Sequence, residues 1–249
     1  RAMMKAVAAP EGVILIEDNK PDAVALMEEK VAPYDNIRVV AAKTQYPEGA
    51  EKMLIKKVVG RQVPSGKLPA DVGCVVSNTS TAKAISDAIQ KGMPLVERAV
   101  SVTGDFIRNP GNYMVKLGTN VQELIDHCGG ITGDDVVLKM GGPMMGAPLK
   151  DTNVPIIKGS NGVIAIAADH TEEKECIKCG RCVDVCPMEL QPLEIYKYGQ
   201  LGDAEKLLTL NVMDCFSCKC CEYICSSKIP LVSKINAAKG LVMPLLKKK

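Results

Sequence analysis

The spacing of its cysteines constrains this chain more than any other feature. Nine of the eleven cysteines lie between residues 176 and 225. Eight of these nine form two copies of the spacing C-x2-C-x2-C-x3-C, namely Cys176, Cys179, Cys182 and Cys186, and then Cys215, Cys218, Cys221 and Cys225. Clustered cysteines outside a small secreted domain more often bind metal than form a disulfide framework. The sequence therefore predicts a metal-binding C-terminal segment.

The repeated spacing favours two cubane four-iron, four-sulfur clusters. Three cysteines at two-residue gaps let a loop wrap one corner of a cubane, with its backbone N–H groups directed at the sulfurs. In two-cluster ferredoxins the fourth cysteine of each copy ligates the other cluster. The expected ligand sets are therefore crossed: Cys176, Cys179 and Cys182 with Cys225, and Cys215, Cys218 and Cys221 with Cys186. The alternative is two structural zinc sites, but such sites pair C-x2-C knuckles and do not use a third cysteine at the next step.

Three further features qualify this motif. Residues 190–210 have helical periodicity, and residues 231–241 form another candidate helix, so we expect an all-helical ferredoxin domain. Ser226 stands where the first copy has Pro187. Cys220 adjoins Cys221, but its spacing fits a ligand less well, and we interpret it as a buried small thiol.

The N-terminal half alternates helix and strand signals, which is typical of an α/β fold. Asp18 and Asn19 are candidate caps for a helix with Pro21 in its first turn. Further helices are expected at 49–59 and 81–91, and strands at 37–42 and 72–76.

From Arg98 the pattern changes to a small α+β module. Strands are expected at 99–103, 113–117 and 136–140, around a short helix that Asn120 caps. Residues 151–170 are predicted to be a connector with one apolar strand at 163–167.

The cysteine copies and several upstream segments resemble the C subunit of the Rnf electron-transport complex (the RnfC family). The similar segments are Cys176-Ile-Lys-Cys-Gly-Arg-Cys, Glu17-Asp-Asn-Lys-Pro, Tyr46-Pro-Glu-Gly-Ala-Glu-Lys, Gly60-Arg-Gln-Val-Pro-Ser-Gly and Pro110-Gly-Asn-Tyr. That family is related to the flavin subunit of respiratory complex I. The resemblance implies the later part of an FMN-binding α/β domain at 1–97, a β-grasp (SLBB-like) module at 98–150, a connector at 151–170 and a helical two-cluster ferredoxin domain at 171–249.

The resemblance also implies flavin-binding residues. Tyr46, Gly49 and Glu51 match a Tyr-x-x-Gly-Glu-Glu flavin loop, whereas Ala50 replaces its first glutamate. Asn78 and Thr81 match an Asn-Asn-x-x-Thr segment. Taken without the resemblance, the first group is a loop that enters a helix, and the second is ordinary helix capping. The family's glycine-rich flavin loop is expected before Arg1, so the chain is interpreted as a fragment that lacks the N-terminal region, with an incomplete FMN site.

The function implied is that of an electron-transfer subunit in a ferredoxin:NAD oxidoreductase that couples electron flow to sodium or proton translocation. Its expected partners are the other Rnf subunits, NAD(H) and, indirectly, ferredoxin, at the cytoplasmic face of the membrane as a peripheral subunit. The net charge of +2 argues against nucleic acid. No catalytic side chain is expected, because the cofactors carry the chemistry. The alternatives are a cobalamin reductase of propanediol metabolism and a partner-binding module whose clusters are structural.

Overall fold

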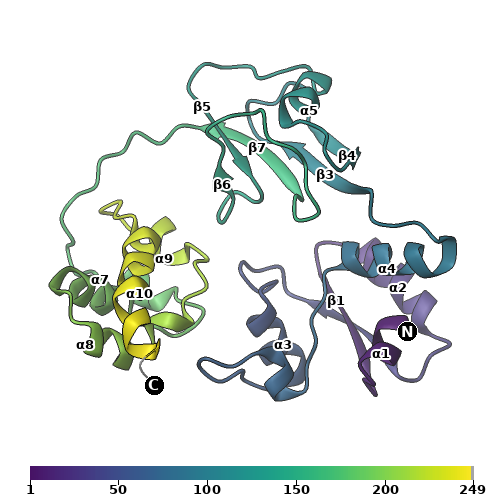
Figure 1. Cartoon of the computed structure of the whole chain (residues 1–249), viewed down its shortest axis with the longest axis horizontal. Helices are drawn as coiled ribbons and strands as arrows, with labels where there is room; N and C mark the ends of the chain where they lie inside the picture. The colour runs from purple at the N-terminus through teal and green to yellow at the C-terminus, as the bar shows by residue number, and fades with distance from the viewer. Residues whose placement is uncertain (248–249) are drawn as a thin grey trace. The chain divides into compact units, whose positions relative to one another are not determined.

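The computed structural model describes residues 1–247 and divides into two compact units, Arg1–Ser86 and Asp87–Lys249 (Figure 1). The second unit contains a β-rich module followed by a helical cysteine-rich domain. Among the described residues, no helix has the length and apolar character needed to cross a membrane. The mixed fold class expected from the sequence is confirmed.

The first unit is built on a parallel βαβ element. Strands β1 (Gly12–Glu17) and β2 (Ile37–Ala42) pair in parallel, from Gly12 opposite Ile37 to Glu17 opposite Ala42. Helix α2 (Pro21–Val31) connects the two strands and packs on β2. The other elements are α1 (Ala2–Ala6), α3 (Glu51–Val59), the 3-10 turn η1 (Pro69–Val72) and α4 (Thr79–Lys91).

Two local expectations in this unit were wrong. Residues 72–76 do not form a strand, because Gly73 ends η1 in the left-handed conformation with φ +71°. The N-cap of α2 is Lys20, without a side-chain cap, rather than Asp18 or Asn19. Instead, Asp18 accepts hydrogen bonds from the backbone N–H (2.9 Å) and hydroxyl (2.8 Å) of Thr44, which joins the carboxyl ends of β1 and β2.

The β-rich module is a five-stranded sheet in the order β4-β3-β7-β5-β6. Its strands are β3 (Glu97–Thr103), β4 (Gly111–Lys116), β5 (Val136–Met140), β6 (Ala147–Pro148) and β7 (Gly162–Ala167). Helix α5 (Val121–His127) begins at Asn120, whose side chain accepts from the N–H of Gln122. Helix α5 lies beside the strands of this sheet (Figure 1). Its buried face joins the strands in one apolar core, to which Val100, Val102, Ile125 and Val163 contribute.

Strand β7 changes the expected extent of this module. The strand was expected inside a connector, yet it pairs in parallel with β3 and antiparallel with β5. Val163 and Ala165 are almost completely buried, as an apolar central strand requires. The module therefore continues to Ala167, beyond the boundary at residue 150 that the sequence suggested.

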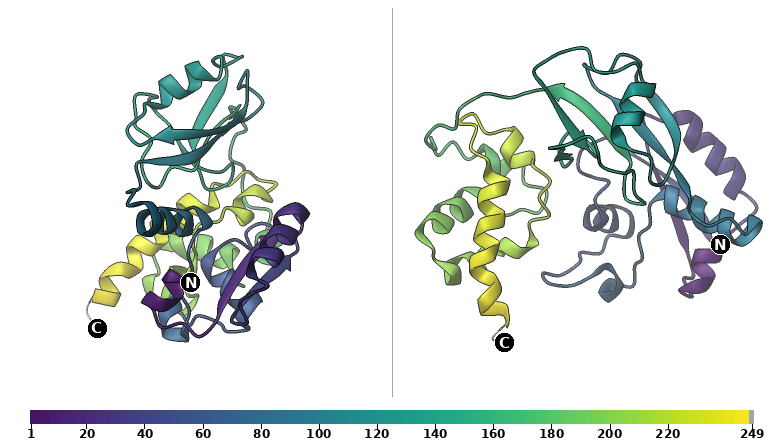
Figure 2. Two further views of the ribbon diagram at one scale, coloured as in Figure 1. Left: turned by 90° about the vertical axis from the view of Figure 1, so that its right-hand side faces the viewer. Right: turned by 45° about the horizontal axis from the view of Figure 1, so that its top comes forward.

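The C-terminal domain is helical, as expected. It contains α6 (Arg181–Asp184), α7 (Pro192–Leu201), α8 (Ala204–Thr209), the 3-10 turn η2 (Val212–Asp214), α9 (Cys220–Tyr223) and α10 (Leu231–Lys247). Helix α10 packs along α7 and α8, as the yellow and green ribbons of Figure 2 show. Its core includes Ile195, Leu207, Val212, Ile235 and Val242, each at most 1% exposed.

The helix expected over 190–210 is two helices. Gly202 adopts the left-handed conformation, with φ +70°, and ends α7. Asp203 then caps α8 by accepting from the N–H of Lys206. The chain thereby reverses between two short helices, and both pack against α10.

Candidate iron–sulfur centre

The eight cysteines of the two copies line two separate cavities in the helical domain. One cavity is lined by Cys186, Cys215, Cys218 and Cys221, with Ile195 and Ile235 among its apolar neighbours. The other is lined by Cys176, Cys179, Cys182 and Cys225, with Ile229 and Leu231 among its neighbours. We call these the inner and the outer cavity, because Cys218 and Cys221 are buried whereas Cys179 is exposed. The fourth cysteine of each copy thus lies with the first three of the other.

Internal repetition produces this crossed arrangement. The copies are offset by 39 residues, and the same offset relates α6 to α9 in both first and last residue. It also relates the first residues of α7 and α10, Pro192 and Leu231. Each copy therefore forms the same loop, short helix and following long helix. The cysteine two residues after each short helix, Cys186 or Cys225, lines the cavity of the other copy.

Left-handed backbone positions shape both loops. Lys178 and Gly180 in the first loop have φ +56° and +79°, and the corresponding Ser217 and Lys219 have +61° and +67°. A non-glycine residue is uncommon in this region, so three such residues in two short loops indicate a strongly specified backbone. Loops with this turn geometry present successive N–H groups to one side, which suits an anionic group.

Burial controls the protonation of the inner cysteines. It raises the pKa of the Cys221 thiol to about 12 and that of Cys218 to about 11. A hydrogen bond with the Cys220 side chain acts on the pKa of Cys218 in the same direction. Burial also raises the pKa of Cys182 and of Cys186. Metal binding requires thiolates, so ligation at these positions depends on the positive charge of the bound metal.

The donor sets fit four-iron clusters. Each cavity has four cysteine sulfurs, the ligand number of such a cluster, and its remaining lining is largely apolar. Within residues 1–247, no group of three or more His, Cys, Asp or Glu side chains has the geometry to hold a single metal ion. The four sulfurs of each cavity are the donor set that a four-iron cluster requires.

Cys220 differs from the interpretation as a buried thiol. Cys220 is half-buried, and its thiol forms a hydrogen bond with the thiol of Cys218. Cys221, in contrast, is 6% exposed and lines the inner cavity. Cys220 begins α9 at the position that Arg181 occupies in α6. The helical turn therefore directs Cys221, and not Cys220, into the cavity.

Contacts that the sequence did not predict hold the two copies together. Ser227 is 5% exposed, and its hydroxyl donates to the carbonyl of Glu175 at 2.9 Å. The N–H of Lys174 donates to the carbonyl of Ser227 at 2.8 Å. The segment before Cys176 is thereby tied to the segment after Cys225, next to the outer cavity. A serine after a cysteine motif carries no recognisable signal for this role.

One further contact joins α10 to the inner cavity. The ammonium of Lys239 donates to the carbonyl of Cys215 at 2.5 Å. The 39-residue offset relates Lys239 to Gln200 in α7. Comparing the two copies at this offset shows that a lysine stands here where the first copy has an amide.

The expected flavin residues lie on two segments of the first unit. Tyr46 and Gly49 lie in the loop after the carboxyl end of β2, and Glu51 is in the first turn of α3. Asn78 precedes α4 and accepts from the N–H of Ser80 at 2.9 Å, and Thr81 is exposed in α4. Ligands of open α/β sheets bind beyond the carboxyl ends of the strands, and helix N-termini favour phosphate. These polar segments fit part of an FMN site.

Three family models match the chain in succession. A Nuo51 FMN-binding domain matches residues 1–87, an SLBB domain matches residues 99–148, and a 4Fe-4S dicluster domain matches residues 175–229. The order agrees with that of the structural units along the chain. The third match contains all eight cysteines that line the two cavities.

Proteins similar in sequence to this chain are named as C subunits of ion-translocating oxidoreductase complexes. The C subunit of the Na(+)-translocating ferredoxin:NAD(+) oxidoreductase complex of Acetobacterium woodii is 40% identical over 95% of this chain and 54% of its own length. The proton-translocating counterpart of Clostridium ljungdahlii is 43% identical over 80% of this chain and 44% of its own length. The C subunit of the ion-translocating oxidoreductase complex of Rhodobacter capsulatus is 42% identical over 96% of this chain and 47% of its own length. The chain spans about half the length of these relatives, and it belongs to the RnfC family, the C subunits of the Rnf-type ion-translocating oxidoreductase complexes.

Proposed function

We propose that this chain is the electron-transfer part of the C subunit in a ferredoxin:NAD oxidoreductase that couples electron flow to ion translocation. The observation that carries the proposal is the pair of four-cysteine cavities with crossed ligand sets. Cys176, Cys179, Cys182 and Cys225 would hold one [4Fe-4S] cluster, and Cys215, Cys218, Cys221 and Cys186 the other. When bound, such clusters supply one-electron redox chemistry at potentials that hydrogen bonds, charge and exposure set.

We assign part of an FMN and NAD(H) site to the first unit. Asn78 and Thr81 would bind the flavin's phosphate or ribityl chain at the start of α4. Tyr46, Gly49 and Glu51 would form one wall beyond the carboxyl end of β2. The flavin supplies hydride exchange with the nicotinamide. In this division, residues 1–97 serve the flavin, the β-grasp module follows, and residues 171–249 form the ferredoxin domain.

The same proposal places the chain among other Rnf subunits at the cytoplasmic face of the membrane. Its support is that the relatives are named as subunits of a complex. Exposure adds a second reason, since Cys179 is exposed and the neighbouring Ile177 is 68% exposed. The outer cavity therefore has a short path to a docked electron carrier.

Anaerobic purification with iron and sulfide analysis tests the proposal. We expect about eight iron and eight sulfide per chain, and two reversible one-electron couples in a dithionite titration monitored by EPR. A chain that holds the iron but shows no reversible reduction would be a binding module with structural clusters. Zinc in place of iron would exclude electron transfer altogether.

A further inference from the structure

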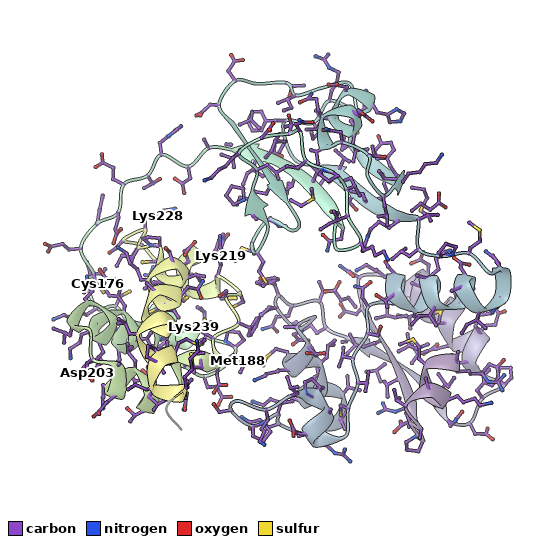
Figure 3. The ribbon with its side chains drawn as sticks, viewed as in Figure 1. Cys176, Met188, Asp203, Lys219, Lys228 and Lys239 are labelled. Carbon is purple, nitrogen blue, oxygen red and sulfur yellow. The ribbon has the colours of Figure 1, made fainter. Side chains whose placement is uncertain are left out.

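A half-buried lysine of α10, Lys239, lies beside the inner cavity. Helix α10 lies along the second cysteine loop and contacts it twice. Asn236 accepts from the hydroxyl of Ser217 at 3.2 Å. Lys239, labelled on α10 in Figure 3, donates to the carbonyl of Cys215 at 2.5 Å. Asn236 and Lys239 are three residues apart, so they share one face of the helix. That face of α10 is fitted to the inner loop.

The first copy lacks this cation. The 39-residue offset places Gln200 of α7 where α10 has Lys239, and Gln200 is exposed, with its amide donating to the hydroxyl of Tyr196 at 3.0 Å. The change from amide to ammonium is therefore specific to the inner cavity. The offset also places Lys197 of α7 where α10 has Asn236, but Lys197 is exposed and its ammonium lies 3.7 Å from the carboxylate of Glu194.

Other cations near the cavities act less strongly. Arg181 lines the outer cavity, but Arg181 and Lys178 are both exposed, so solvent screens their charges. Lys219 lines the inner cavity, but its ammonium lies 3.9 Å from the carboxylate of Glu222, which offsets its charge. Lys239 is half-buried, and in residues 1–247 no acidic side chain forms an ion pair with it.

Resting on the proposed function, we propose that Lys239 is a positioning residue that raises the reduction potential of the inner cluster above that of the outer one. Reduction adds one negative charge to a cluster, and a half-buried cation beside its ligand stabilises that form. Lys239 also polarises the peptide group of Cys215 through its hydrogen bond. The inner cluster thereby holds an electron in preference to the outer cluster.

The test is an EPR-monitored redox titration of the anaerobically purified chain, of three lysine variants and of two cysteine variants. Lys239→Gln copies the residue of the first repeat and removes the charge. Lys239→Arg keeps the charge. Lys234→Gln is the matched control, because it removes an exposed lysine of the same helix, one that pairs with Glu173 at 3.6 Å. Cys179→Ser and Cys218→Ser assign the two couples to the outer and inner clusters.

We expect Lys239→Gln to lower the inner potential alone. The equilibrium constant for electron transfer from the outer to the inner cluster would fall about tenfold, which is about 59 mV for a one-electron couple. Lys239→Arg and Lys234→Gln would keep the difference in potential between the two clusters that the unmodified chain has. Equal shifts of both couples, no shift in Lys239→Gln, or the same shift in Lys234→Gln would overturn the proposal.

Iron content and thermal unfolding of each variant distinguish an effect of Lys239 on cluster retention or folding from an effect on the reduction potential. Loss of iron from Lys239→Gln or Lys239→Arg would assign Lys239 to cluster retention and would also overturn the proposal. Absence of two reversible couples in the unmodified chain would instead refute the proposed function, before any variant is compared.

Discussion

Replacing Cys225 with alanine tests the crossed ligand sets most directly. In the crossed arrangement this change removes one ligand from the outer cluster, which Cys176, Cys179 and Cys182 otherwise hold. Iron should fall from about eight to about four per chain. The lost cross-link closes a loop of about 50 residues, and the chain-entropy relation assigns such a link about 4 kcal/mol. The helical domain of the variant should therefore unfold at a markedly lower temperature than that of the unmodified chain.

Double variants make the result decisive. Cys179→Ala combined with Cys225→Ala should lose no more iron than either single change, because both ligands belong to one cluster. Cys218→Ala combined with Cys225→Ala should lose both clusters. Cys220→Ala is the matched control, since this thiol begins the same short helix outside the ligand sets, and it should keep all of the iron. The opposite pattern for the two double variants would show that each copy ligates its own cluster.

Three further predictions concern other parts of the chain. Gly104→Ala should destabilise the β-grasp module by more than about 3 kcal/mol in denaturant unfolding. The reason is that Gly104 has φ +112° and an added Cβ would lie 2.0 Å from the carbonyl oxygen of Ala165. An unchanged unfolding midpoint would contradict this close approach to β7. The Thr44 hydrogen bonds lower the pKa of Asp18, so they stabilise the fold above the ordinary carboxyl pKa, and this contribution is lost as the pH falls through the lowered value. Thr44→Val should therefore raise the Asp18 pKa in an NMR titration, and an unmoved titration would refute the assigned cause. High salt or a mild chaotrope should release the native subunit from membranes without detergent, whereas a requirement for detergent would contradict peripheral attachment.

The helical domain was predictable because its sequence signal is local and repeated. The 39-residue offset of the cysteines predicts two similar loops. In the structure, the fourth cysteine of each copy lines the same cavity as the first three cysteines of the other copy. The break at Gly202 was less predictable. Leucine periodicity continues through Leu201 and Leu207, while the reversal depends on a single left-handed glycine.

Long-range pairing limited the remaining predictions. The apolar pattern of 163–167 indicates a buried strand, but the choice of β3 and β5 as its partners depends on tertiary packing. The same kind of pattern at 72–76 failed, because a short apolar run does not by itself provide a neighbouring strand. There Val75 is 66% exposed. The positions of Tyr46 and Asn78 at the entrances to α3 and α4 followed from turn and capping chemistry, whereas their flavin role stays a prediction.

The repeat of loop and helix has a consequence for the order of events during synthesis. Cys225 leaves the ribosome roughly 40 residues after Cys182, which at about 5–20 residues per second is a delay of roughly 2–8 s. During that interval the first loop presents three thiols and the bond between Ser227 and Glu175 cannot yet form. Cys186 likewise waits for the second loop. Neither four-cysteine set is therefore complete until the second copy has been synthesised.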